Sequence, residues 1–422
     1  MNKTIIVVGA GLAGLCCTRA LERLGYSVKL LESSDGVGGR VRTDVYKGFQ
    51  LDRGFQVLFS AYPAVVKELN LSDLNLKQFQ PGAMILKNGS REFITDPRRM
   101  PSQLIHTAFS SLFSWRDKFK VLDLTSKIGG QTLDQIAALP DVSMGEYLKE
   151  FGFSKQFADN FISPFFGGIF LEKDLRTSVR MFAFVWAMLA QGNTCIPAGG
   201  MGAISQQIAS GLKSDTISLS SPVQELIVVN NEVRGVLMLN GEKLEADAVV
   251  LATPFDTTAE LAGMDIPLSW RSSTAVYFSL NTPLYNHKLI TLDTSPNRVI
   301  NNIALVSNVA SGYAPSGKHL LCATILGCKE PNDEKLFSQT REALIKLFPE
   351  SVDYGWEALK IYRVNNAQFA QNPGVWDTLS AIESPYAQLE LAGEYRVSSS
   401  IHGAMQSGLD AAQRLHASLQ TN

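Results

Sequence analysis

The pattern of apolar and polar positions divides the first 32 residues into a strand, a helix and a second strand. Residues 5–8 are apolar and β-branched throughout, which is typical of a parallel strand buried on both faces. Residues 12–24 predict a helix that stops at Gly25, a residue that favours a helix C-terminus. Residues 28–31 predict the second strand, which brings Glu32 to its carboxyl end. The N-terminal segment is therefore expected to form a βαβ unit.

Further along the chain, short apolar strands alternate with separate helices. Turn residues at 230–231 and 240–241 separate three short apolar runs and predict a meander. An amphipathic helix is expected over residues 333–348, and a last helix from Ile401 to Leu415. The expected strands of the meander and those that follow it are residues 223–229, 233–239, 243–246, 248–252, 274–280, 301–308, 319–326 and 389–394.

The length of the chain predicts more than one domain. It has 422 residues, whereas single hydrophobic cores stop growing at about 250–300 residues. Along the sequence, the expected strands and helices belong alternately to two domains. We expect residues 1–80, 196–265 and 386–422 to form one domain, and residues 81–195 and 266–385 to form the second.

Composition narrows the classes of function. The chain is 45% hydrophobic and 18% charged with a formal net charge of −2, so it lacks the basic surface that nucleic acids require. Its five cysteines are scattered without metal-ligand spacing, which predicts no metal site and a reducing compartment. The longest apolar run, residues 181–190, is about half the length of a membrane span, and the N-terminus shows no signal-peptide pattern. We therefore expect a cytoplasmic protein.

A glycine motif joins the first strand to the first helix. Gly9 permits a tight turn, Gly11 lets backbone approach a pyrophosphate, and Gly14 lets the helix pack close to the strand. The free N–H groups and the dipole at the helix N-terminus favour the same anionic group. Glu32 follows Gly14 by 18 residues, where an acidic side chain accepts hydrogen bonds from a ribose. The segment predicts a dinucleotide site of Rossmann type.

A second glycine loop follows Glu32 and reads Asp35-Gly36-Val37-Gly38-Gly39-Arg40. With this loop the chain resembles the FAD-dependent amine oxidase and phytoene desaturase superfamily, and more closely its desaturase-like branch. The resemblance implies an α/β fold, in which a Rossmann-type FAD-binding domain carries a discontinuous α+β substrate domain. It also implies FAD bound non-covalently, because no cysteine lies in the segment just before residue 389.

The resemblance extends to segments far from the N-terminus. It implies that the segment around Gly54 passes the isoalloxazine ring, and that Val223 holds the adenine through its backbone. It also implies that Glu394 contacts the ribityl and pyrophosphate region, and that the last helix, from Ile401, points its N-terminus at the ring. The expected cofactor-binding residues are Gly9, Ala10, Gly11, Ala13, Gly14, Glu32, Gly38, Gly39, Arg40, Gly54, Phe55, Val223, Gly393, Glu394 and Ile401.

The sequence predicts an oxidoreductase without an obvious catalytic side chain, because a flavin carries the hard step and the protein orients the substrate. His402 is expected to cap the last helix or to contact FAD. Amine-oxidising members of the superfamily carry an aromatic residue just before the last helix, where this chain has Ser400. They also carry a tryptophan where this chain has Val397. We therefore expect hydride removal from an apolar, carotenoid-like or isoprenoid-like substrate. An FAD-dependent amine or amino-acid oxidase reoxidised by O₂ is the alternative, and a protein that keeps FAD without turnover is a third.

Two apolar stretches leave their roles open. Residues 160–170 resemble a Pro-Phe-Phe-Gly-Gly stretch of desaturase-like members, and either line a substrate channel or pack between the domains. Residues 98–120 combine basic and apolar side chains, which suits either a solvated face or a peripheral contact with an anionic membrane surface. The substrate, the electron acceptor and the oligomeric state stay open.

Overall fold

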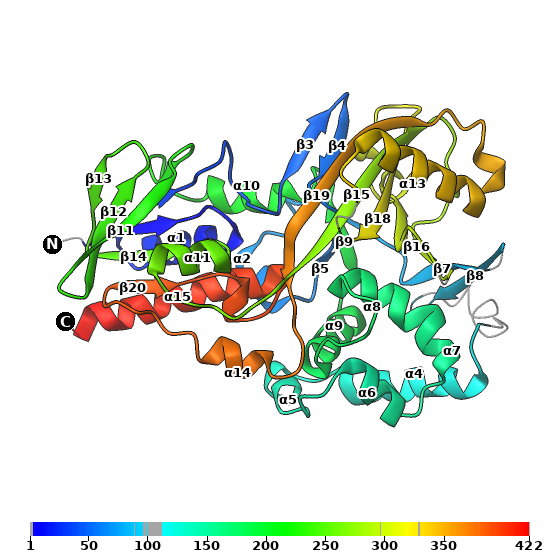
Figure 1. The fold of residues 1–422 in the computed structure, drawn as a ribbon, viewed down its shortest axis with the longest axis horizontal. Helices are drawn as coiled ribbons and strands as arrows, with labels where there is room; N and C mark the ends of the chain where they lie inside the picture. The colour runs from blue at the N-terminus through cyan, green and yellow to red at the C-terminus, as the bar shows by residue number, and fades with distance from the viewer. Residues whose placement is uncertain are drawn as a thin grey trace.

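The computed structural model describes residues 3–87, 89–95, 99, 112–295, 297–327 and 330–421. A five-stranded parallel sheet occupies the left half of the molecule in Figure 1. Its strands in spatial order are β10 (Ile217–Ser218), β2 (Ser27–Leu31), β1 (Thr4–Val8), β14 (Ala248–Leu251) and β20 (Leu389–Leu391). Strand β1 is central because its side chains are apolar on both faces, and it pairs in parallel with β2 and β14. This is the expected Rossmann-type sheet, assembled from segments that span the whole chain.

Helices α1 (Leu12–Arg23) and α15 (Ile401–Thr421) pack against each other beside this sheet. A side chain at Gly408 of α15 would collide with the backbone of Ala13 of α1, so the two helices touch backbone to backbone at this point. Both helices confirm the sequence prediction, although α15 extends beyond Leu415. The two ends of the chain lie at the same end of the molecule (Figure 1).

The predicted meander is present beside the parallel sheet. It consists of β11 (Val223–Val229), β12 (Glu232–Met238) and β13 (Lys243–Glu245), paired antiparallel. Asn230 and Asn231 adopt φ of 50° and 64°, as a two-residue hairpin turn requires. The Asn-rich turn predicted at this position is confirmed.

A seven-stranded sheet forms the upper right part of the molecule (Figure 1). Its strands in order are β19 (Glu357–Phe369), β15 (Trp270–Leu280), β18 (His319–Leu326), β17 (Asn302–Leu305), β16 (Ile290–Asp293), β7 (Gly82–Lys87) and β8 (Ser90–Thr95). Neighbouring strands run antiparallel except β7 and β16, which pair in parallel. Helix α13 (Asp333–Leu347) packs its apolar side chains against one face of this sheet.

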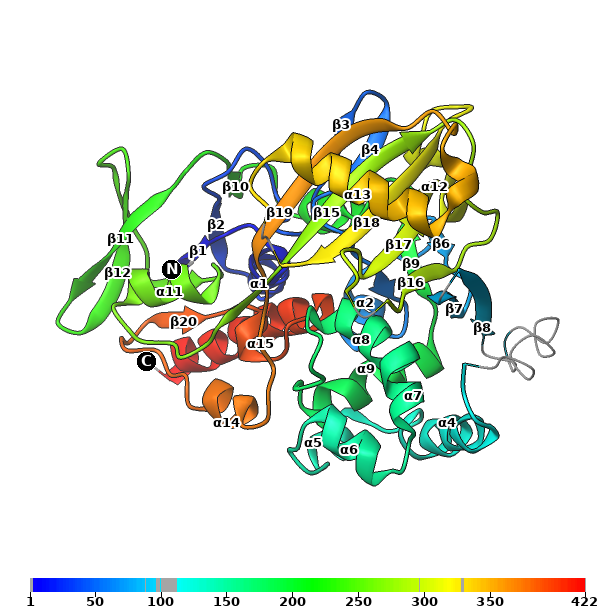
Figure 2. The same ribbon diagram turned by 45° about the vertical axis from the view of Figure 1, so that its right-hand side comes forward.

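A layer of helices lies below this sheet, as Figure 2 shows. Its elements are α4 (Trp115–Ile128), α5 (Leu133–Ala137), α6 (Met144–Glu150), α7 (Lys155–Phe157), the π-helical turn η2 (Ala158–Ile162), α8 (Ser163–Phe170) and α9 (Val179–Gln191). Helix α9 is buried along most of its length, as expected for an apolar run without a polar stripe. Within the described residues, no helix is both long and apolar enough to cross a membrane.

Two small antiparallel sheets connect the halves. Strands β3 (Thr43–Tyr46) and β4 (Phe49–Asp52) form a hairpin. The second small sheet contains β5 (Leu58–Phe59), β9 (Thr194–Pro197) and β6 (Leu76–Gln78) in that order. Both sheets lie in segments for which the apolar pattern predicts no strand.

One predicted strand ends earlier than expected. The pattern predicts a strand over residues 301–308, whereas β17 stops at Leu305 and a short helix, α12 (Val306–Val309), follows. Ser307 Oγ accepts a hydrogen bond from the backbone N–H of Leu320, and Asn308 donates its side-chain N–H to the carbonyl of Tyr285. These side chains offer the backbone alternatives to strand pairing and end the strand.

Candidate functional site

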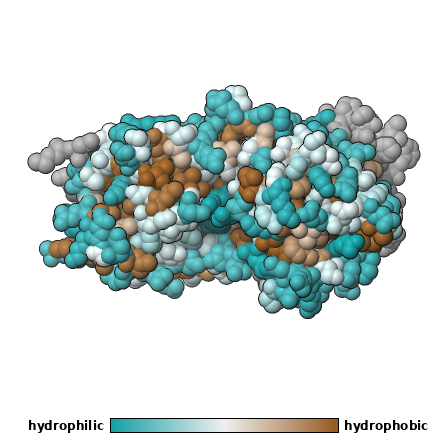
Figure 3. Space-filling view, turned by 90° about the horizontal axis from the view of Figure 1, so that it is seen from above, coloured by the Kyte–Doolittle hydropathy of each residue, from teal (hydrophilic) through white to brown (hydrophobic). Residues whose placement is uncertain are grey.

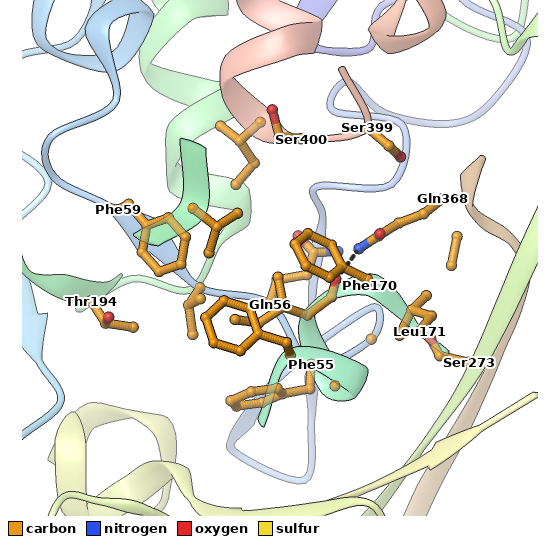
Figure 4. Close-up of a pocket in the computed structure, with 18 of the residues that line it drawn as sticks. Phe55, Gln56, Phe59, Phe170, Leu171, Thr194, Ser273, Gln368, Ser399 and Ser400 are labelled. Carbon is orange, nitrogen blue, oxygen red and sulfur yellow. Dashed lines mark hydrogen bonds between the residues drawn. The ribbon is translucent and has the colours of Figure 1, made fainter. Parts of the chain in front are cut away.

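A cavity of about 1200 Å³ lies between the two halves of the molecule. Residues of the β1–α1 turn, of the second glycine loop and of the start of α15 line one end of it. Side chains of α4, α8 and α9 line the other end. Strands β15 and β19 of the seven-stranded sheet extend toward the parallel sheet (Figure 1). Ser273 of β15 and residues 362–368 of β19 also line the cavity, and Figure 4 shows Ser273 and Gln368.

The β1–α1 turn presents backbone to the cavity. Gly9 has a φ of 100°, and a side chain there would meet the carbonyl oxygen of Ala252. A Cβ on Gly14 would overlap the carbonyl oxygen of Gly9, so the strand and the helix touch through backbone atoms. A Cβ on Gly11 would meet no atom within 4 Å and would extend into open space beside the cavity that Gly11 lines. No side chain caps α1, so the N–H groups of its first turn are available to a ligand.

Glu32 is held rigidly at the end of β2. Its Oε2 accepts a hydrogen bond of 2.8 Å from the backbone N–H of Ala10, and its Oε1 accepts one of 2.8 Å from Ser34. The residue is only 8% exposed, yet it lines the cavity. Oε1 also accepts a 3.4 Å hydrogen bond from Ser33 Oγ, whereas Oε2 has a second lone pair with which Glu32 can accept a hydrogen bond from a ligand.

An ion pair joins the N-terminal and C-terminal parts of the site. The Arg40 guanidinium lies 2.5 Å from Glu394 Oε1, and it also donates a 2.9 Å hydrogen bond to the carbonyl of Ala367. The same guanidinium lies 5.5 Å from the ring centroid of Trp270. Arg40 is therefore held by three segments that are far apart in sequence, and it lines the cavity between them.

The structure brings most of the predicted cofactor-binding residues to this one cavity. Ala10 and Gly14 do not line it, since Ala10 is fully buried behind the turn and Gly14 packs against Gly9. Val223, at the start of β11, does not line it either. The predicted residues in its wall are Gly9, Gly11, Ala13, Glu32, Gly38, Gly39, Arg40, Gly54, Phe55, Gly393, Glu394 and Ile401.

Aromatic rings form the other end of the cavity. The π-helical turn η2 leads into α8 and sets Phe157, Phe161 and Phe165 in a row, with centroids 5.7 Å and 5.2 Å apart. Phe166 stacks on Trp186 of α9, with 5.9 Å between the centroids. All five rings line the cavity, and Phe166 is also buried in the core. Residues 160–170 therefore both line the cavity and pack in the core, and their role as a substrate channel stays a prediction.

His402 lies behind the wall. Its ring stacks on Tyr62 and lies 5.4 Å from the ring of Phe184, and its Nδ1 accepts a hydrogen bond from the backbone N–H of Ala64. Burial lowers the pKa of His402 to about 4, so the ring is neutral. His402 does not line the cavity, and none of the described residues that do is a histidine or a cysteine. Its geometry is that of a packed structural histidine.

Sequence reasoning missed a buried carboxylate between the two halves. Asp52 accepts hydrogen bonds from Thr43 Oγ1 at 2.5 Å, from the backbone N–H of Met201 at 2.9 Å and from Tyr313 OH at 3.0 Å. Tyr277 OH of β15 donates to the backbone carbonyl of Asp52. Burial raises the pKa of Asp52 to about 6. Only its place next to Arg53 and Gly54 signals a role, since these neighbours line the cavity.

Helix α4 carries exposed apolar side chains at the outer end of the cavity. Trp115, Phe119 and Leu122 line the cavity and are 59%, 67% and 49% exposed. Their spacing places them on one face of the helix. Part of the stretch 98–120, namely residue 98 and residues 100–111, lies outside the described residues.

Comparisons with known proteins identify the family. The model of the flavin-containing amine oxidoreductase family matches residues 12–416, so the chain belongs to this family. It is 25% identical to 15-cis-phytoene desaturase of Glycine max, over 97% of this chain and 79% of that protein. It is 23% identical to 15-cis-phytoene desaturase of Synechococcus elongatus, over 97% of this chain and 95% of that protein.

Solved structures share the fold. A putative protoporphyrinogen oxidase from Exiguobacterium superimposes with a TM-score of 0.77 at 18% identity, over 100% of this chain and 99% of that one. The fold is therefore that of a Rossmann-type FAD-binding protein, and by family the chain is an oxidoreductase with FAD as its cofactor.

The cavity fits a flavin dinucleotide. The open space beside Gly11 and the uncapped first turn of α1 suit a pyrophosphate. Glu32 supplies fixed acceptors for a ribose at the same end. Groups of three or more potential metal ligands do not occur among the described residues.

Proposed function

We propose that the protein binds FAD non-covalently along this cavity and removes a hydride from a C–H bond of an apolar substrate. The single observation that carries the proposal is the continuity of the cavity. One space connects a backbone cradle for a dinucleotide with a wall of aromatic rings. A substrate held among the rings would lie next to a flavin held at the cradle.

The cofactor is assigned to the predicted residues in the following way. The first turn of α1 and the loop at Gly38 and Gly39 receive the pyrophosphate, and Glu32 accepts hydrogen bonds from the ribose. Arg40 and Glu394 form the ion pair beside the same phosphates. Gly54 and Phe55 pass the ring, whose pyrimidine edge faces the helix start at Ile401. Val223 does not line the cavity and would reach only the adenine, through its backbone. We also propose the division into two domains at the residue ranges given above.

Non-covalent binding is supported by the position of the thiols. The described cysteines, Cys16, Cys17, Cys195 and Cys322, are all buried, and none lines the cavity. Burial raises the pKa of Cys16 to about 12, so this thiol is not a nucleophile near neutral pH. A denaturant should therefore release the flavin intact.

The contribution of the chain is orientation and the exclusion of water. A bound flavin supplies the hydride acceptor. The rings of Phe161, Phe165 and Phe170 surround an apolar molecule and keep water away from the reacting C–H bond. Holding the substrate in one pose against the ring is the main effect that such a wall supplies.

The position before the last helix favours an apolar substrate over an amine. Ser400 lines the cavity where amine-oxidising relatives are expected to carry an aromatic ring. Its hydroxyl accepts a hydrogen bond of 2.9 Å from the backbone N–H of Gly403 and so caps the last helix. Position 400 therefore offers a hydroxyl that caps the helix, and not the aromatic ring that would align an amine there.

Anaerobic bleaching of the flavin tests the proposal. The purified holoenzyme is mixed with a polyene or isoprenoid precursor, or with amines and amino acids, and the flavin absorbance is followed. We expect bleaching by the apolar compounds alone. Bleaching by amines alone would replace the proposal by an amine oxidase. A flavin that none of these compounds reduces would favour a protein that holds FAD without turnover.

We also propose that helix α4 contacts an anionic membrane surface and admits the substrate. Its exposed apolar face stands next to the basic residues Arg116, Lys118 and Lys120. Phe119→Ser should weaken co-sedimentation with vesicles of equal phosphatidylcholine and phosphatidylglycerol. Val45→Ser, at an exposed apolar residue of the β3–β4 hairpin, is the control. Equal sedimentation of all three proteins would rule out this surface.

A further inference from the structure

Two glutamine side chains stand in the wall of the cavity, in the region that Figure 4 shows. Gln56 follows Gly54 and Phe55, where the flavin ring is proposed to lie. Gln368 lies near the end of β19, opposite Arg271 of β15. Each glutamine carries a carboxamide, a group that can both donate and accept hydrogen bonds.

The side-chain nitrogen of each glutamine is committed to a backbone carbonyl. Gln56 Nε2 donates a 2.8 Å hydrogen bond to the carbonyl of Arg40, and Gln368 Nε2 donates one of 2.8 Å to the carbonyl of Ile169. A carbonyl oxygen can only accept, so the atom that faces it must be the nitrogen of the amide. The orientation of both carboxamides is therefore determined, and in each the oxygen is directed away from its anchor.

Gln368 is held by the end of a helix. The carbonyls of Ile169 and Phe170 belong to the last turn of α8, where helical partners are missing. Gln368 satisfies the first carbonyl, and Arg271 satisfies the second with a 3.1 Å hydrogen bond. Leu171, the next residue, has a φ of 54°, which is a strained conformation for a leucine. The carboxamide is thus fixed where the backbone turns along the cavity wall.

The two oxygens differ in what can reach them. Gln56 Oε1 accepts no hydrogen bond from any described residue, but it is buried too completely for a ligand in the cavity to contact it. Gln368 is half-buried and lines the cavity, and no described residue donates a hydrogen bond to its Oε1. Gln368 Oε1 can therefore accept a hydrogen bond from a ligand.

We propose that Gln368 selects an apolar substrate that carries a hydrogen-bond donor, a hydroxyl or N–H group, within reach of its side-chain oxygen. This inference rests on the proposed function and narrows it, because a plain hydrocarbon offers no hydrogen bond to this oxygen. A carbonyl oxygen also disfavours a carboxylate at this position. The substrate class is therefore an amphiphile with one neutral donor on an apolar body.

Binding of matched ligands tests the inference without turnover. The holoenzyme is titrated with dodecanol, with a nonylpyrrole and with dodecyl methyl ether, and the shift of the flavin absorbance gives each Kd. The ether resembles the alcohol in size but donates no hydrogen bond. We expect the wild-type protein to bind the alcohol or the pyrrole about tenfold more tightly than the ether, as one buried hydrogen bond allows.

The variant Gln368→Leu should reduce this preference to about twofold or less while the Kd of the ether changes little. A merely structural role in capping α8 would weaken all three ligands together and leave their ratio unchanged. Thr194→Val, another polar residue of the wall (Figure 4), is the matched control and should keep the preference.

Each outcome decides. Preference for the alcohol alone identifies a hydroxyl-bearing substrate, and preference for the pyrrole alone an N–H-bearing one. Equal binding of all three ligands by the wild-type protein, which needs no variant to fold, overturns the inference and leaves the proposed function intact. A preference that survives in Gln368→Leu also overturns it. If the protein binds none of the three ligands, both the inference and the proposal of an apolar substrate are wrong.

Discussion

At the end of the cavity beside β1 and α1 the wall is made of backbone, whereas beside α8 and α9 it is made of rings. Gly9 and Gly11 leave no side chain between the ligand and the peptide groups. Phe165 and Trp186, in contrast, define the opposite end with the side chains themselves. A backbone wall tolerates almost no added atom, while a wall of rings can be repacked by exchanging one side chain for another. The first end suits an invariant ligand and the second a variable one.

The surface of the molecule is less sharply divided than its interior. On the face that Figure 3 shows, hydrophobic patches are interrupted by hydrophilic residues. Such a mixture is normal, because much of any folded surface is apolar. The contrast between the two ends of the cavity is therefore the feature that experiments should address.

The largest effect is expected from a side chain at the crossing of β1 and α1. In Gly14→Ala the new Cβ would overlap the carbonyl oxygen of Gly9, and neither backbone segment can move without opening the turn. We expect a loss of more than about 4 kcal/mol in the free energy of unfolding, measured by denaturant titration. Gly211→Ala, at the end of α10 (Gly202–Ser210), is the control, because its Cβ would make ordinary contacts. Equal stability of the two variants would contradict the close packing described.

The next effect tests the wall of rings. Phe166 is 1% exposed and packs on Phe182 and Trp186, so Phe166→Ala should cost about 3–5 kcal/mol in the free energy of unfolding. The flavin absorbance per folded molecule should equal that of the wild-type protein, because the Phe166 side chain lies at the end of the cavity opposite the β1–α1 turn. Loss of flavin from the folded variant would show that the two ends are not independent.

Asp52 connects the two halves and makes their union depend on pH. Its pKa rises from 3.8 in the unfolded chain to about 6 in the folded protein, because burial disfavours the charged form. Asp52 therefore contributes about 3 kcal/mol to the free energy of unfolding below pH 4, and this contribution is lost as the pH rises through 6. Asp52→Asn should remove this dependence. Denaturant titrations of both proteins from pH 4 to pH 7 check it, and parallel curves would show that Asp52 does not titrate.

The smallest effect on stability is expected at Gly11. Its φ is −70° and a Cβ there would meet no protein atom, so Gly11→Val should change the unfolding of the flavin-free protein by less than about 0.5 kcal/mol. Flavin occupancy should nevertheless fall at least about tenfold, since the side chain would occupy the pyrophosphate position. The ratio of flavin to protein absorbance measures it. Full flavin occupancy in Gly11→Val would contradict the proposed position of the cofactor.

Local signals predicted the backbone end of the site. The β1–α1 turn, the placement of Glu32 and the turn at Asn230 and Asn231 each depend on a few neighbouring residues whose chemistry has one structural solution. The final helix at Ile401 was predicted for the same reason. Such features can be read before any partner segment is known.

The remainder depends on contacts between distant segments. The parallel pairing of β7 with β16 places Ala83 opposite Ile290, and the residue pattern of neither strand predicts its partner. Asp52 acquires its role only when Tyr313 and Met201 reach it. The rings of residues 160–170 do not reveal which side faces a cavity until α9 packs against them. Val223 starts a strand that was predicted correctly, whereas its contact with the adenine stays a prediction because the residue does not line the cavity.

The position of β20 has a consequence for biosynthesis. Strand β14 cannot complete its pairing until Leu389–Leu391 has been made, and Glu394 and Ile401 follow even later. At about 5–20 residues per second, a ribosome takes about 20–80 s to reach this strand. Until then β14 lacks one neighbour and α1 lacks α15, so a nascent chain carries an unfinished edge. We therefore expect the flavin to be acquired only after β20 and α15 have been synthesised, and this strand and helix to act as the closing step of maturation.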